Sequence, residues 1–364
     1  MLPTPLRHAP VPSMADPTLR GYSPDDTLPP VEPPSASFLV QLFLVPALIV
    51  GIIVSVWISF YWLAQLGNDP QASVRTLRRN TEGRWQAALN LANDLRGSGG
   101  AKLKADTVLA AELASILDDE VKSGRPVGSG YAAEQSRALC VYLCRALGEF
   151  TVPEAAGPLM THAGETADVE IAQAAVEALA VLATNLATAG RSFTDPAAVT
   201  AAVIAATRSE DKYLRTRAAF SLGVVGGEQA RSRLTVLCED GDDNVRYNAT
   251  LGLARLGDST AYGTLAEMLG LPDVSVEDGK DETHSERYRR VMVVVNALKG
   301  VGLLVDNTGE PPPAAVTDAV VALREDAVGD VRQAARALLR RIERLDPVGS
   351  ESSSDPLVAP AAAP

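Results

Sequence analysis

The stretch DKYLRTRAAFSLGVVGG, residues 211–227, decides the fold, because a second version of it, DDNVRYNATLGLARLGD, begins thirty-one residues later at residue 242. In the first version Leu214, Ala218 and Leu222 recur every four residues, which is the spacing of one helical face. The chain therefore contains an internal repeat built on an amphipathic helix. Seven positions are identical at this offset: Asp211/Asp242, Arg215/Arg246, Ala218/Ala249, Leu222/Leu253, Gly226/Gly257, Ala230/Ala261 and Leu234/Leu265.

Each version of the repeat predicts a helical hairpin. Gly226 follows the first helix, at a position where glycine commonly ends a helix in the left-handed conformation. Ala230, Leu234 and Leu237 then mark a second amphipathic helix. A single hairpin cannot bury its apolar side alone, so successive hairpins must stack on one another. The sequence therefore predicts an all-α fold of the α-solenoid type.

Weaker versions of the same spacing lie on both sides of this pair. Together they predict about six hairpins and a final capping helix within residues 72–346. Phe220 and Leu251 also match in kind at the offset of thirty-one residues. The weaker versions are RWQAALNLANDL (residues 84–95), SRALCVYLCRALG (136–148), IAQAAVEALAVL (171–182), RVMVVVNALKGVG (290–302) and VRQAARALLRRI (331–342).

These phrases resemble HEAT repeats, and the match is strongest over residues 211–270 and 330–342. The resemblance implies a HEAT-like α-solenoid in which an Asp and an Arg of adjacent units form a ladder. The positions that match this ladder are Asp211/Arg215, Asp242/Arg246 and Asp330/Arg332, whereas the versions near residues 137 and 171 depart from it. A Pro-rich tail, one apolar segment and a helical array together also resemble membrane-anchored bacterial HEAT-repeat proteins.

The region before the array predicts one N-terminal transmembrane helix at residues 37–66. No charged residue occurs between Pro33 and Asn68, and residues 42–64 are as long as the ~20 residues that a helix needs to cross hydrocarbon. A cleaved signal peptide or a buried core helix fits this length less well. The Pro-rich residues 1–36 and residues 347–364 are predicted to be disordered tails.

A stripe of small residues recurs every four positions in the apolar segment, and such a stripe permits close approach of two membrane helices. It predicts weak homo-oligomerisation through this helix, although small residues are common in membrane helices in general. The stripe consists of Ala47, Gly51, Ser55 and Ser59.

The basic residues that flank the apolar segment predict its orientation, because Lys and Arg are retained on the cytoplasmic side. The N-terminal flank holds Arg20, whereas the C-terminal flank holds Arg75, Arg78, Arg79 and Arg84. We therefore expect a single-pass protein of the inner, cytoplasmic membrane with the solenoid in the cytoplasm. Export of the solenoid by a signal anchor is the alternative.

Charge and motifs predict neither a nucleic-acid ligand nor an enzyme. The net charge of −12 does not favour binding to nucleic acid. Cys140 and Cys144 share a helical face, but only His162 is a nearby histidine, and metal sites usually need three or four ligands. No phosphate-binding glycine loop or nucleophile elbow is present. We therefore expect no catalytic residues, no metal and no cofactor.

The expected function is that of a membrane-anchored scaffold whose extended surface binds a protein partner of unknown identity. The alternative is an enzyme or enzyme regulator, for example a lyase-like HEAT array, that acts through a polar insertion at residues 273–290. A basic stripe on the last helix is a candidate partner-binding site, although solubility of a terminal repeat also explains it. This stripe consists of Arg332, Arg336, Arg340 and Arg344.

Overall fold

The computed structural model of the protein describes residues 35–66, 70–79, 83–164, 168–274 and 281–345. Every regular element in these residues is a helix, which confirms the all-α prediction. The chain divides after Asn68 into two compact units. The predicted tails at residues 1–36 and 347–364 lie outside the described residues, apart from Ser35 and Ala36.

Among the described residues, the first unit contains one helix, α1 (Ala36–Leu66), which includes Pro46. Within Ala36–Trp62, an eighteen-residue window has a mean hydropathy of 2.7, and none of this window is buried. Two other helical segments, Val169–Thr188 and Thr283–Thr308, are also long and apolar enough to cross a membrane, but 56% and 44% of their apolar windows are buried. By length, composition and exposure together, α1 is the candidate membrane-spanning helix among the described residues.

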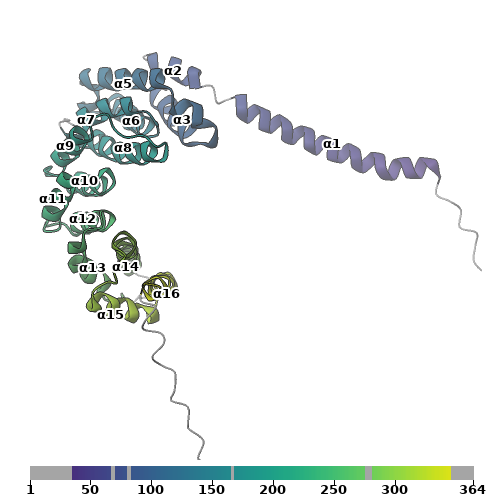
Figure 1. The fold of residues 1–364 in the computed structure, drawn as a ribbon. Helices are drawn as coiled ribbons and strands as arrows, with labels where there is room; N and C mark the ends of the chain where they lie inside the picture. The colour runs from purple at the N-terminus through teal and green to yellow at the C-terminus, as the bar shows by residue number, and fades with distance from the viewer. Residues whose placement is uncertain (1–34, 67–69, 80–82, 165–167, 275–280, 346–364) are drawn as a thin grey trace, which may run out of the picture. The chain divides into compact units, whose positions relative to one another are not determined.

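The second unit is an array of α-helices (Figure 1). Its α-helices are α2 (Pro70–Arg78), α3 (Arg84–Arg96), α4 (Ala101–Lys104), α5 (Thr107–Lys122), α6 (Tyr131–Gly148), α7 (Ala156–Gly164), α8 (Val169–Thr188), α9 (Pro196–Ala206), α10 (Lys212–Val225), α11 (Glu228–Leu237), α12 (Asp243–Arg255), α13 (Tyr262–Leu269), α14 (Asp281–Thr308), α15 (Ala314–Ala322) and α16 (Gly329–Glu343). Its 3-10 turns are η2 (Ser98–Gly100), η3 (Arg125–Val127), η4 (Pro153–Ala155), η5 (Ser259–Ala261) and η6 (Leu323–Glu325).

The longer helices alternate between two rows. The inner row contains α3, α6, α8, α10, α12, α14 and α16, and each of these packs against the next. The outer row contains α5, α7, α9, α11, α13 and α15. Figure 1 shows α8, α10, α12, α14 and α16 on the inner side of the bend of this unit. The alternation gives six helix pairs followed by α16, which agrees with the number expected from the sequence.

Local signals that repeat along the chain begin and end these helices. The carboxylates of Asp211 and Asp242 accept hydrogen bonds from backbone N–H groups in the first turns of α10 and α12. Gly226 and Gly257 follow the same helices with φ angles of +77° and +70°, in a region that side chains with a Cβ rarely adopt. The same caps in both versions of the repeat explain why both fold into the same hairpin.

Small residues allow the inner-row helices to approach closely. Ala218 in α10 and Ala249 in α12 are fully buried. A Cβ atom placed on Gly223 would lie 2.5 Å from Cα of Gly252, so these two glycines face each other across the contact between α10 and α12. The repeat therefore uses alanine and glycine where two backbones meet.

The interpretation of residues 273–290 as a polar insertion is wrong for its second half. Helix α14 begins at Asp281, so Asp281–Arg290 form its first turns, while residues 275–280 lie outside the described residues. The run of charged residues hid this helix, because most side chains of its first turns face solvent and give no apolar periodicity. Arg290 is an exception, since only 7% of its side chain is exposed.

Candidate partner-binding face

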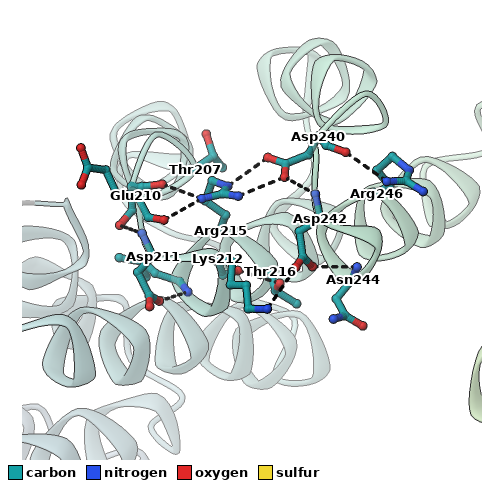
Figure 2. A network of polar contacts seen from close by, with 12 residues as sticks. Thr207, Glu210, Asp211, Lys212, Arg215, Thr216, Asp240, Asp242, Asn244 and Arg246 are labelled. Carbon is teal, nitrogen blue, oxygen red and sulfur yellow. Dashed lines mark hydrogen bonds and ion pairs between the residues drawn. The ribbon is translucent and has the colours of Figure 1, made fainter. Parts of the chain in front are cut away.

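A polar ladder joins successive repeats of the array, and Figure 2 shows its central part. The guanidinium of Arg215 in α10 donates two hydrogen bonds to the carboxylate of Asp240, with Nε–Oδ2 and Nη2–Oδ1 distances of 2.9 and 3.1 Å. Its Nη1 also donates to the carbonyl oxygens of Ser209 and Glu210. Burial favours the protonated form of Asp240, but the hydrogen bonds from Arg215 and the backbone of Asp242 lower its pKa below the ordinary value.

The ladder differs from the pairs that the resemblance implied. Asp211 and Asp242 act as helix caps, and Asp242 also lies 3.5 Å from Nζ of Lys212. Arg246 contacts Asp243, Glu267 and the carbonyl oxygen of Asp240. The partner of Arg215 is Asp240, which lies in the loop before α12 and is not the cap of that helix.

Two more Arg–Asp pairs extend the ladder along the array. Arg290 lies 2.6 Å from Asp326, which places the last rung there and not at Asp330/Arg332. Arg137 and Asp168 form a rung between α6 and the start of α8, although the sequence analysis had excluded this version of the repeat. These two residues are 31 positions apart, whereas the Arg215–Asp240 and Arg290–Asp326 pairs are 25 and 36 positions apart, so the rungs share no spacing in the sequence. A separate pair, Arg231 and Asp258, joins the first turn of α11 to the residues that follow α12.

The inner row presents a second group of side chains, which faces solvent. At one end Tyr142 of α6 stacks against Trp85 of α3, with ring centroids 6.2 Å apart. The guanidinium carbon of Arg145 lies 5.3 Å from the Tyr142 ring centroid, within the range of a cation–π interaction. Two aromatic rings and one arginine are thus held together across two repeats.

The middle of this face is a shallow hollow over α8, α10 and α12. Arg217 forms an ion pair with Glu177 of the neighbouring helix. Phe220 and Val181 are 42% and 38% exposed, so an apolar surface lies beside this pair. The hollow has a volume of about 360 Å³ and is lined by Glu177, Val181, Thr216, Arg217, Phe220 and Asn248.

Arg255 of α12 closes the far end of the face. Its guanidinium carbon lies 5.5 Å from the ring centroid of Phe220, and its Nη1 is buried without a hydrogen-bond partner. Burial lowers the pKa of Arg255. Burial, followed by repulsion from Arg145, also lowers the pKa of Arg217. A lowered pKa at Arg217 and Arg255 is the direction expected for guanidinium groups whose positive charge has too few acceptors around it.

We call this group of side chains the arginine–aromatic track. It consists of Trp85, Tyr142, Arg145, Glu177, Val181, Arg217, Phe220 and Arg255. Within the described residues, only Arg217 of its three arginines has an ion pair with a carboxylate. The sequence alone did not point to the track. Phe220 matches Leu251 at the repeat offset, but Leu251 packs against the core whereas Phe220 is 42% exposed, so this match did not signal an exposed site.

The four arginines of the basic stripe predicted on α16 have two different environments in the structure. Nη1 of Arg332 donates to the carbonyl oxygens of Asp326 and Ala327, and Nη2 of Arg336 donates to the carbonyl oxygen of Arg324. These two arginines therefore brace the turn before their own helix. Arg340 and Arg344 are exposed and remain the candidates for contact with a partner.

The small-residue stripe lies on α1, where Ala47, Gly51, Ser55 and Ser59 are all exposed. The hydroxyl of Ser59 donates to the carbonyl oxygen of Ser55 at 2.7 Å, so its polar group is satisfied within the helix. Trp57 and Tyr61 stack nearby with their centroids 6.0 Å apart. Self-association through the stripe stays a prediction.

The cysteines belong to the core. Cys140 and Cys144 are fully buried, and burial raises the pKa of the Cys144 thiol to about 12 and that of Cys140 as well. Nε2 of His162 lies 2.9 Å from Asp118. Among the residues that the structure describes, no three His, Cys, Asp or Glu side chains are placed to share a metal ion. The expectation of no metal and no cofactor stays a prediction.

Repeated hairpins, two rows of helices and an Arg–Asp ladder define this array as an α-solenoid. Residues 199–277 match the family model of HEAT repeats. Residues 199–277 are therefore HEAT-like repeats, as the resemblance implied for this part of the chain. No curated protein matches it in sequence.

Several solved structures are similar to the chain at low identity. The complex of CpcE and CpcF of phycocyanin lyase from Nostoc sp. is 15% identical, with 76% of this chain and 95% of that chain covered and a TM-score of 0.43. Human deoxyhypusine hydroxylase is 20% identical, with 76% and 96% covered and a TM-score of 0.30. An engineered protein is 16% identical, with 76% and 98% covered and a TM-score of 0.31.

The expectation that this chain is not an enzyme needs correction. Two of the similar structures are named as a lyase and a hydroxylase. The sequence argument relied on missing motifs, and motifs of compact enzyme folds do not cover chemistry carried on a repeat array. The fold by itself supports the coarser description of a repeat scaffold.

Proposed function

We propose that this protein is a membrane-anchored scaffold whose HEAT-like array binds a protein partner at the membrane. The observation that carries the proposal is the pairing of an unburied apolar helix with a separate repeat array in one chain. A helix of this length and hydropathy is stable in hydrocarbon, whereas its exposed leucine, isoleucine and phenylalanine side chains would be costly in water. The array adds a long row of helices whose inner face exposes both apolar and charged side chains.

The basic flank of α1 supports placement of the array on the cytoplasmic side, as the excess of arginine after this helix favours. Two of these arginines also have partners in the array, since Arg78 pairs with Glu112 and Arg84 lies 2.7 Å from Glu120. A partner held by the array would therefore be concentrated at the cytoplasmic surface of the membrane.

The anchoring part predicts that the full-length protein stays in the membrane pellet after alkaline carbonate extraction. A matched chain that lacks residues 36–66 should move to the supernatant, because the second unit buries its own apolar helices. Release of the full-length protein by carbonate would contradict the anchor. Retention of both chains would mean that another part of the protein holds the membrane.

The partner-binding part predicts a discrete covalent adduct when a photoreactive p-benzoylphenylalanine replaces an exposed apolar residue in native membranes. Phe220 in the inner row and Val236 in the outer row, which is 58% exposed, are suitable positions. A defined adduct with one protein from either position would support a scaffold. Absence of any adduct from both positions would contradict it.

A further inference from the structure

The arginine–aromatic track is assembled from helices that are distant in sequence. Its arginines come from α6, α10 and α12, and its two apolar side chains come from α8 and α10. Arg217 contacts Glu177, and Phe220 contacts Arg255, so the track is continuous over the middle of the inner row. No core function explains it, since Phe220 and Val181 are left exposed.

The charge on the track is unbalanced. Three arginines stand against one carboxylate, Glu177, although the whole chain has a net charge of −12. Nε of Arg217 and Nη1 of Arg255 are buried without hydrogen-bond partners. These two atoms are enclosed, so the positive charge of both arginines is incompletely compensated within the fold, and a carboxylate from outside would contact the solvent-facing nitrogens of the track.

The apolar part of the track limits which anion fits. Phe220 and Val181 line the hollow of about 360 Å³ beside Arg217, a size that accepts a side chain or two but no folded domain. A free phosphate or carboxylate would leave this apolar surface uncovered. A peptide carries apolar side chains and carboxylates on the same backbone, so it can use both.

From this geometry we propose that the track binds an acidic peptide segment of a partner protein. One apolar side chain of the segment enters the hollow between Val181 and Phe220, and flanking Asp or Glu side chains reach Arg145 and Arg255. The proposal deepens the proposed function, on which it rests, by stating the chemistry of the partner. Single-stranded nucleic acid fits less well, because the Tyr142 and Phe220 rings are already covered by arginine and the net charge of the chain repels a polyanion.

The test uses the full-length protein in nanodiscs of zwitterionic lipid and a displayed library of random twelve-residue peptides. We expect enrichment of peptides that combine Asp or Glu with one large apolar residue. Enriched peptides should bind the Arg145→Gln/Arg255→Gln variant about tenfold or more weakly, because two charge-assisted contacts are lost. This variant keeps the Arg217–Glu177 pair, and its thermal unfolding and helical signal report whether the array remains folded.

The matched control is Arg208→Gln/Arg324→Gln, which removes the same charge from two exposed positions outside the track. It should leave peptide affinity unchanged. The charge reversal Arg145→Glu/Arg255→Glu should select peptides rich in Lys or Arg. Acidic peptides lost in the control variant, or no acidic enrichment at all, would overturn the proposal.

Binding of a labelled dT12 oligonucleotide at physiological salt, with dependence on Arg145 and Arg255, would also overturn it and assign the track to nucleic acid. Failure here is distinguishable from failure of the scaffold proposal. A defined photo-adduct without enrichment of acidic peptides would support the scaffold proposal and contradict only the acidic-peptide proposal. Absence of both the photo-adduct and the enrichment would contradict both proposals.

Discussion

Asp326→Asn is expected to lower the free energy of unfolding of the C-terminal repeats by about 3–5 kcal/mol, because it leaves the buried Arg290 guanidinium without its close counter-charge. The two side chains are only 7% and 4% exposed and lie 2.6 Å apart. Asparagine keeps the shape of the side chain and the acceptor for the backbone N–H of Val328. The loss of unfolding free energy therefore measures the contribution of the negative charge of Asp326. Hydrogen exchange of α14–α16 in the full-length protein measures it.

The matched control is Asp273→Asn, since Asp273 lies 3.7 Å from the same arginine but is 44% exposed. We expect a change of less than about 1 kcal/mol for this solvent-screened pair. Equal changes in the free energy of unfolding for the two variants would show that the buried Arg290–Asp326 pair stabilises the fold no more than the exposed Arg290–Asp273 pair.

Acid should remove the difference between Asp326→Asn and the unsubstituted protein. Burial opposes the charged form of Asp326, but hydrogen bonds from Arg290 and the Val328 backbone lower its pKa. A carboxyl with a lowered folded-state pKa contributes stability above its unfolded-state pKa, and this contribution is lost as the pH falls through the folded-state pKa. A difference that persisted unchanged in strong acid would contradict the electrostatic explanation.

Gly223→Ala is expected to cost about 3 kcal/mol, at the upper end of the range for overpacked cores. Its new Cβ would lie 2.5 Å from Cα of Gly252, and backbone atoms cannot move aside as a flexible side chain can. The helices α10 and α12 must therefore separate. Urea unfolding and hydrogen exchange of these two helices would report the loss.

The control for this substitution is Gly263→Ala on the exposed side of α13, where a Cβ meets no atom within 4 Å. There alanine should stabilise the helix by about 0.5–1 kcal/mol, because glycine loses more backbone entropy on folding. The same chemical change thus has opposite signs at two positions. A neutral Gly223→Ala would mean that α10 and α12 are farther apart than described.

The two-row array could be predicted because its information is local and repeated. Leu214, Ala218 and Leu222 define a buried helical face by spacing alone, and Asp211 and Gly226 mark the ends of that helix. The second version of the repeat then forces stacking, since neither hairpin can bury its face without the other.

Polar and charged contacts between repeats could not be predicted in the same way. Arg215 has Asp211 close by in sequence, yet it pairs with Asp240 in the loop before the next inner helix. The start of α14 was missed for a related reason. Its first turns are solvated, so no apolar period reports them, and the burial of Arg290 depends on Asp326 of a later loop.

The sequence by itself determined that the region after the apolar helix folds as a repeated helical array and that α1 is a candidate membrane helix, because apolar period and segment length are properties of neighbouring residues. Only the tertiary structure decided which exposed side chains meet on the inner row. Arg145, Glu177, Arg217, Phe220 and Arg255 come from four helices. Their proximity depends on the distance and register at which those helices pack, which glycines such as Gly223 and Gly252 set by backbone contact.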